Sequence, residues 1–137
     1  MSRSGYNEDC ENLDLWRGAV ASAIRGKRGQ ALLRDMLAAL DALPAPRLIE
    51  GELEREGPEG GVCALGAVGR ARGMDMDLID PEDREQVAAC FDIAEALAAE
   101  IAYVNDEDGS SDQTPEQRWV SVRAWVVSKI SAPPVRT

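Results

Sequence analysis

Residues 47–73, RLIEGELEREGPEGGVCALGAVGRARG, decide the fold, because the residue pattern here changes from helical to extended. Side chains alternate in character with a period close to two from residue 48 to 55, the spacing of a strand. The run 57–61, GPEGG, supplies a turn, and Val62 begins a second apolar run. We therefore expect a β-hairpin at about 47–65. An isolated two-stranded ribbon is only marginally stable in water, so helices must cover its apolar face.

The segments on either side of this stretch predict helices. Apolar residues recur three to four positions apart in residues 13–24 and again in 33–40, which places them on one face of a helix. A further helix is expected at 65–72, directly after the hairpin. Two glycines inside it, Gly66 and Gly69, each weaken a helix by roughly 1 kcal/mol relative to alanine. A helix tolerates such glycines where another part of the backbone packs closely against it.

Capping residues mark where later helices begin. Asp80 followed by Pro81 matches an N-cap with proline at the first helical position, and Asp92 is another candidate N-cap. Residues 114–117, TPEQ, match a capping box, in which the threonine and glutamine side chains accept from each other's backbone amides. The last helix is therefore expected to begin at Pro115.

The predicted fold class is mainly α (α+β), with about six helices packed around a short β-hairpin. One domain across 1–137 is expected, because a chain of 137 residues can bury a core without disulfides or metals. The ends at 1–10 and 132–137 hold few apolar anchors, so we expect them to be flexible.

Cysteine usage and hydropathy favour the cytoplasm. Cys10, Cys63 and Cys90 are an odd number and lack the spacing of a zinc site, so we expect reduced thiols. No basic segment followed by an apolar run opens the chain. Charged residues interrupt each apolar segment well short of the roughly 18 residues that span a membrane. We therefore expect a cytoplasmic protein without a membrane partner.

The charge of the chain is unevenly distributed. The formal net charge is −10, yet residues 74–116 alone carry 14 acidic residues and one basic residue. Residues 117–137 carry four basic residues and no acid. Such asymmetry favours docking of a positively charged partner on the acidic side. We expect that acidic face to comprise Asp75, Asp77, Asp80, Glu82, Asp83, Asp106, Glu107, Asp108 and Asp112.

Two other interpretations of these carboxylates stay open. They form a solvated surface that keeps the protein soluble, or the run from Asp75 to Asp83 binds a divalent cation, which prefers several convergent oxygen ligands. Helix capping explains the acids around Pro81 better than a cation does, because carboxylates stabilise the positive end of a helix dipole. No metal or other cofactor is therefore expected.

A secondary basic patch is expected at the turn between the first two helices, formed by Arg17, Arg25, Lys27, Arg28 and Arg34. Clustered cations of this kind suit nucleic-acid phosphates. The net charge of −10 would repel a duplex in every other orientation, so we do not expect direct nucleic-acid binding. The alternative partner for the patch is the acidic segment of a second subunit, which would make the protein a homo-oligomer.

The sequence gives little sign of catalysis. It contains no histidine, which removes the commonest general base and the commonest metal ligand. Cys63 is the best remaining nucleophile candidate, because it lies at a strand-to-helix junction where amide dipoles activate thiols. Free cysteines are more often small buried core residues, and we favour that interpretation for both Cys63 and Cys90. No catalytic residue is predicted.

A resemblance is carried by three segments: WRGAVASAIRGKRGQALLRDMLAALDALP at 16–44, VCALGAVGRARG at 62–73 and TPEQRWVSVRAWV at 114–126. They are similar to segments of small uncharacterised proteins encoded by tailed bacteriophages and prophages of proteobacteria, for which no activity is established. The resemblance implies a phage context inside a host bacterial cell, and it assigns no catalytic residue.

These observations lead to a non-enzymatic, phage-derived accessory protein that binds another macromolecule through its acidic face. Carboxylates placed where a host protein normally holds nucleic-acid phosphates would act as a nucleic-acid mimic. The expected target is a nucleic-acid-handling or defence complex, inhibited in the manner of an anti-CRISPR protein. Two alternatives stay open: a homo-oligomeric structural or assembly component, and a small enzyme that depends on a cysteine or a carboxylate pair.

Overall fold

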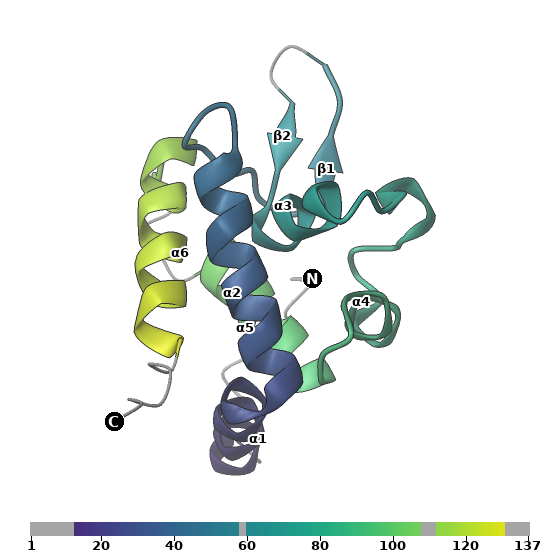
Figure 1. Cartoon of the computed structure of the whole chain (residues 1–137), viewed down its shortest axis with the longest axis vertical. Helices are drawn as coiled ribbons and strands as arrows, with labels where there is room; N and C mark the ends of the chain where they lie inside the picture. Colours follow the sequence, from purple (N-terminus) through teal and green to yellow (C-terminus); the bar gives the residue numbers. More distant parts are fainter. Residues whose placement is uncertain (1–12, 58–59, 108–111, 131–137) are drawn as a thin grey trace, which may run out of the picture.

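The computed structural model describes residues 13–57, 60–107 and 112–130, so the ends that we expected to be flexible lie outside the described residues. In this part of the chain six α-helices accompany one two-stranded antiparallel sheet, which confirms the expected mainly α (α+β) class. Figure 1 shows α2 and α6 side by side, with the hairpin projecting at one end. The elements are α1 (Leu13–Arg25), α2 (Lys27–Ala42), β1 (Glu54–Arg55), β2 (Gly61–Val62), α3 (Ala64–Ala71), the 3₁₀ helix η1 (Met76–Leu78), α4 (Arg84–Phe91), α5 (Glu95–Asp106) and α6 (Pro115–Lys129).

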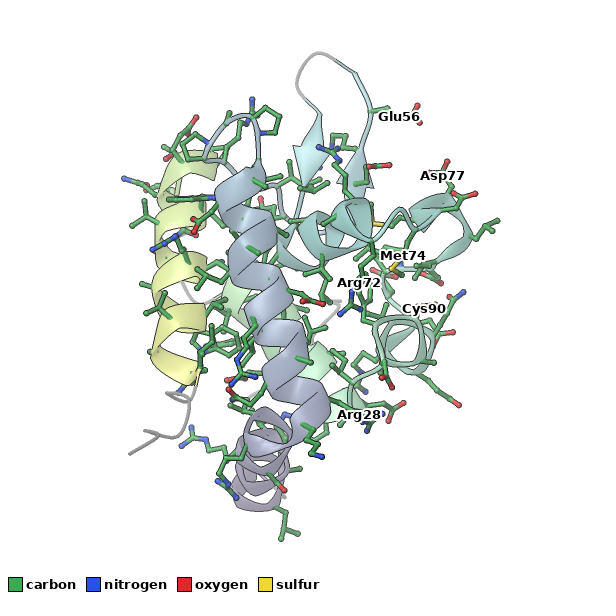
Figure 2. All side chains as sticks on the ribbon, viewed as in Figure 1. Arg28, Glu56, Arg72, Met74, Asp77 and Cys90 are labelled. Carbon is green, nitrogen blue, oxygen red and sulfur yellow. The ribbon has the colours of Figure 1, made fainter. Side chains whose placement is uncertain are left out.

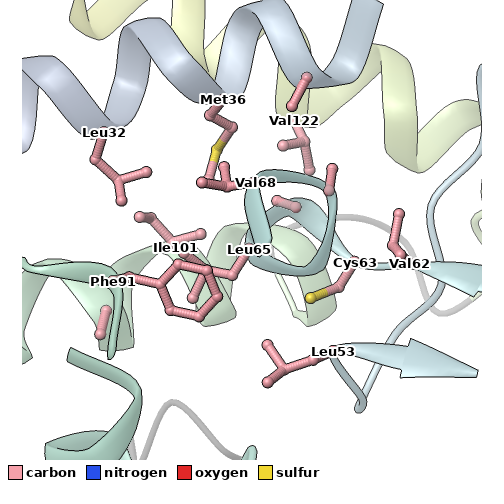
Figure 3. Packing of buried hydrophobic residues seen from close by; sticks show 14 of the residues in the cluster. Leu32, Met36, Leu53, Val62, Cys63, Leu65, Val68, Phe91, Ile101 and Val122 are labelled. Atoms are coloured by element: carbon pink, nitrogen blue, oxygen red, sulfur yellow. The ribbon is translucent and has the colours of Figure 1, made fainter. Parts of the chain in front are cut away.

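Helix α3 lies at the centre of the core. Residues 64–69 are all buried, so this short helix turns no face of those residues toward water. Figure 3 shows α3 nearly end-on, with Val68 directed toward Met36 of α2 and Leu65 directed toward Phe91 and α5. Burying one large apolar side chain contributes roughly 1.5–3 kcal/mol. Shared contact with α3 therefore holds α2, α5 and the hairpin together.

Two glycines let other segments approach α3 closely. A Cβ atom at Gly66 would collide with the backbone carbonyl of Leu53, just before β1. A Cβ atom at Gly69 would collide with the sulfur of Met76. The expectation that another backbone packs against this helix is therefore confirmed at Gly66, whereas Gly69 accommodates a side chain.

The first turn of α3 is buried, and side chains satisfy its amide groups where water cannot. Asn105 Oδ1 accepts from the N–H of Ala64 at 3.0 Å, and Cys63 Sγ accepts from the N–H of Gly66 at 3.4 Å. Asn105 Nδ2 also donates to the carbonyl of Ile49 at 2.8 Å. Asn105 is 1% exposed, so one buried amide links α5, the start of α3 and the segment before β1.

The hairpin is much shorter than the expected 47–65. Its strands contain two residues each, and their antiparallel register pairs Glu54 with Val62 and Arg55 with Gly61. In residues 48–51 the Ile49 N–H donates to the Val62 carbonyl of β2 at 2.9 Å, but no strand forms there, because side chains from α5 and α6 bond other backbone groups of this segment. These side chains are Asn105 to the Ile49 carbonyl, Asp106 to the Gly51 amide and Arg118 to the Leu48 carbonyl.

Helix α4 begins later than the proline signal predicts. Asp80 is not its N-cap, because Asp80 Oδ1 accepts from the N–H of Glu82 at 3.0 Å and closes a separate turn. Asp83 is the N-cap, and its Oδ1 accepts from the N–H of Gln86 at 3.1 Å. Both aspartates thus cap backbone amides, but only the second one starts a helix.

The boundary between α4 and α5 also differs from the prediction. Asp92 ends α4 in the left-handed conformation, with φ of 57°, and Ala94 precedes α5 without a side-chain cap. The expectation that Asp92 caps α5 is therefore wrong. The expected capping box of α6 is confirmed, since Thr114 and Gln117 bond each other's backbone amides and the helix begins at Pro115.

We expect Asn105→Leu to destabilise the fold by about 3 kcal/mol or more, because it leaves the buried Ala64 N–H and Ile49 carbonyl without their partner. For a chain of this size the unfolding midpoint should fall by roughly 10 °C. Thermal and urea unfolding measure this directly. The control is Gln113→Leu, which removes an exposed hydrogen bond to Ser121. Equal stability of the two variants would contradict the role assigned to Asn105.

The contact between α2 and α6 includes a bidentate ion pair. Arg123 Nε lies 2.7 Å from Asp41 Oδ1, and its Nη2 lies 3.1 Å from Oδ2. The hydrogen bonds from Arg123, reinforced by its charge, lower the pKa of Asp41 below the ordinary value. A carboxyl whose pKa is lower in the folded state stabilises the fold above its unfolded pKa of about 3.9, and loses this effect as pH falls through the folded pKa.

A titration of the Asp41 carboxyl by NMR should therefore give a midpoint below about 3.9 in the wild type. The Arg123→Gln variant should raise the midpoint toward that ordinary value, because the bidentate donor is lost. Arg72→Gln, which removes a different ion pair to Asp35, should leave the Asp41 midpoint where it is. A midpoint that is the same in the wild type and in Arg123→Gln would refute this assignment.

Candidate functional site

An exposed acidic segment follows α3 directly. Gly73 has φ of 71° and the N–H of Met74 donates to the carbonyl of Gly69 at 2.9 Å, a left-handed C-terminal motif that redirects the chain. We call residues 75–85 the acidic turn. Figure 2 shows Asp77 at the edge of the molecule, beyond Met74. The turn has six exposed carboxylates: Asp75, Asp77, Asp80, Glu82, Asp83 and Glu85.

The acidic turn is anchored from the inside. Met76 and Ile79 are buried in the main core, while Leu78 between them is 76% exposed. The side chain of Gln86 bridges the backbone of the turn, since Nε2 donates to the Leu78 carbonyl and Oε1 accepts from the Asp80 N–H, both at 2.9 Å. Leu78 is therefore held outward on a backbone that is fixed on both sides of it.

Three of the carboxylates are fixed by backbone amides. Asp75 accepts from the N–H of Asp77 at 3.2 Å, and Asp80 and Asp83 accept from amides two and three positions further on. Hydrogen bonds of this kind hold a short acidic side chain close to its own backbone. Three of the six negative charges of the turn are thus presented at defined positions.

Within the part of the chain that the structure describes, no carboxylate of the acidic turn forms an ion pair. The one base inside the turn, Arg84, lies over the ring of Trp16, 5.8 Å from its centroid. Other arginines pair with carboxylates outside the turn: Arg28 with Asp92, Arg55 with Glu52, Arg70 with Glu54, Arg72 with Asp35, Arg118 with Glu50 and Arg123 with Asp41. The charge of the turn is therefore not neutralised by the described side chains around it.

The second half of the expected acidic face lies elsewhere. Asp106 is half-buried and accepts from the Gly51 N–H at 3.1 Å, beside the start of α3, whereas the acidic turn follows the end of α3. Eight helical residues separate these positions by about 12 Å. Glu107 and Asp112 are exposed, and Asp108 lies outside the described residues. The structure thus divides the expected single face into two groups, and Asp106 has a structural role.

The expected basic patch surrounds Gly26, the single residue between α1 and α2. We call it the basic elbow, and all its members are exposed: Arg17, Arg25, Lys27, Arg28 and Arg34. Arg28 Nη1 pairs with Asp92 Oδ1 at 3.2 Å. The other four have no ion pair among the described residues. Helix α1 also exposes Leu15, at 75% of its surface.

The described residues offer few candidate groups for catalysis or metal binding. Cys63 is buried with its sulfur accepting a backbone N–H, so its interpretation as a core residue is confirmed. Cys90 is exposed, so the same interpretation is wrong for Cys90. Among the described residues no three acidic or cysteine side chains gather as metal ligands. The enclosed cavity next to the turn, beside Pro81 and Val87, has a volume of about 10 Å³, room for one water molecule.

Sequence reasoning missed two residues of this site. The sequence does not predict that Leu78 is exposed, because the alternation of residues 74–78 places it in phase with buried Met76, and the 3₁₀ helix η1 breaks that alternation. The role of Gln86 is hidden because its partners lie six and eight residues away, at Asp80 and Leu78.

Comparison with protein-family models, with curated proteins and with solved structures found no match to this chain. In the described part of the chain, each helix is too short or too polar to cross a membrane.

The bridging role of Gln86 is testable. In Gln86→Ala the amide of Asp80 loses its acceptor, so we expect its hydrogen exchange to become at least tenfold faster, as measured by NMR. The Ala64 amide, which is bonded to Asn105, should keep its protection, because it lies at the other end of α3. Unchanged exchange at Asp80 would show that the turn does not depend on Gln86.

Proposed function

We propose that this protein is non-enzymatic and acts by docking a positively charged surface of another macromolecule on its acidic turn. The observation that carries the proposal is the set of six exposed carboxylates that no described side chain neutralises. A merely solvated surface needs neither the Gln86 bridge nor the buried anchors beneath the turn. Because Asp75, Asp80 and Asp83 are already held by backbone amides, a partner binds these three carboxylates with little further loss of conformational entropy.

The chemistry of the turn indicates the kind of partner. Leu78 stands among the carboxylates, so the complementary surface is one of arginines and lysines around a small apolar recess. A protein surface that normally holds nucleic-acid phosphates offers such cations. Combined with the phage resemblance, this supports an accessory protein that acts in the cytoplasm of a host bacterial cell. Its target is a nucleic-acid-handling or defence complex, which it inhibits by occupying the basic surface.

The test variant removes negative charges from the turn while its side chains still cap the backbone amides. Asn caps amides about as well as Asp, so a variant with Asp75→Asn, Asp77→Asn and Glu82→Gln keeps the backbone of the turn. At about 0.5 kcal/mol for each lost charge contact, its affinity for a partner captured from bacterial lysate should fall roughly tenfold. Leu78→Ala should weaken the same complex, and duplex DNA should compete with it.

The matched control neutralises three exposed acids elsewhere: Glu56→Gln, Glu95→Gln and Glu116→Gln. It changes the net charge by the same amount, so it should keep the partner if the turn itself is the contact. If the control and the turn variant lose the partner equally, only overall charge matters and the acidic turn is not a docking site.

A further inference from the structure

We propose that this protein associates with itself, the acidic turn of one copy binding the basic elbow of a second copy. The inference rests on the proposed role of the turn as a docking surface for cations, and it adds a regulation of that surface. The chain carries both halves of a complementary pair. One half is the turn, and the other is the elbow with four cations that have no ion pair among the described residues.

The two surfaces resemble each other in build and differ in sign. Each carries several like charges, and a strongly exposed leucine lies within the turn, Leu78 at 76%, and on α1, Leu15 at 75%, about 16 Å along the helix from Gly26. Opposite charges steer two such surfaces together and fix their register. Leucines that lose contact with water in the complex supply an attraction that salt does not screen.

The pairing does not occur within one molecule. Arg28, on the side of the elbow nearest to α4, reaches only Asp92 at the end of that helix. Figure 2 shows Arg28 and Asp77 on the same side of the molecule but separated by the part that carries Cys90. The carboxylates of the turn are therefore left without a cation from their own elbow, and the elbow of a second copy can supply one.

The net charge of −10 opposes this contact, and the balance depends on salt. At about 0.15 M salt the screening length is about 8 Å, so distant like charges no longer repel while groups in direct contact still attract. Association should therefore be strongest near that ionic strength and weaker both at about 0.01 M and at about 1 M. A purely apolar contact would instead strengthen with salt.

Self-association would compete with the partner proposed above. The elbow and a basic partner need the same carboxylates, so a turn engaged with a second copy is closed to the partner. If the turn of each copy binds one elbow and the elbow of each copy binds one turn, the copies form either a closed dimer or ring, or an open chain. Dilution or a tighter basic partner would release the turn.

The experiment uses two charge-reversal variants of the full chain. The first changes Asp77, Glu82 and Glu85 to Lys, because no carboxylate that caps an amide is altered. The second changes Arg25, Lys27 and Arg34 to Glu, which are exposed positions without an ion pair in the described chain. The mass of each is measured by sedimentation, alone and as an equimolar mixture, at about 0.15 M salt.

We expect the wild type to exceed its monomer mass of 14.8 kDa and each variant alone to stay monomeric. The mixture should form a 1:1 complex, since the intact elbow of one variant meets the intact turn of the other. A control with Glu56, Glu95 and Glu116 changed to Lys should associate as well as the wild type or better. Circular dichroism spectra matching the wild type establish that each variant is folded.

A wild type that stays monomeric up to about 1 mM, or a mixture that forms no complex, would overturn self-association. These outcomes leave the proposed function intact if the turn variant still loses a lysate partner. Conversely, a 1:1 complex in the mixture together with an unchanged lysate partner would uphold self-association and remove the proposed partner site.

Discussion

The structure depends on hydrogen-bond partners for the backbone amides of α3, a helix that has almost no access to water. Helix α3 is buried from residue 64 to 69, so its first amide groups need partners supplied by the protein. The side chain of Asn105 provides one, since its Oδ1 accepts from the Ala64 N–H while its Nδ2 donates to the Ile49 carbonyl. A buried polar group of this kind is favourable only when every partner is in place, which ties the segment before β1, α3 and α5 into one arrangement.

That arrangement sets the position of the acidic turn. After α3 ends at Ala71, Gly73 adopts a conformation that only glycine adopts easily, and the chain leaves the core with Met76 as its first new buried anchor. The turn is therefore tied to the core at Met76 and Ile79 and tied to α4 by Gln86. A charged loop with such support holds the backbone beneath its carboxylates in a fixed arrangement, which a free acidic tail cannot do.

Local signals in the sequence were sufficient for the fold class and for the elements that local chemistry controls. The capping box at Thr114 and the close backbone approach at Gly66 were both predicted correctly. The partner of Thr114 is near in sequence. A glycine inside a helix indicates a close backbone whichever segment supplies that backbone. The predicted extent of the hairpin was wrong, since the Ile49 N–H still bonds to Val62 of β2 but the carbonyls of Leu48 and Ile49 bond to Arg118 and Asn105, more than fifty residues away. The predicted helix starts at Asp80 and Asp92 were wrong, because an aspartate can also cap a turn or end a helix.

The candidate site shows that acidic residues close together in the sequence do not always form an acidic surface in the folded protein. Residues 75–85 and 106–112 are alike in composition, but the carboxylate of Asp106 accepts a hydrogen bond from the Gly51 N–H. Elsewhere, arginines from α2, α3, α6, the residue after α3 and the hairpin pair with acids that lie outside the turn. Three-dimensional pairing thus sorts the carboxylates into those that hold the fold and those left without a cation. Only the second kind can recognise a partner, because a carboxylate already paired would have to break that contact first.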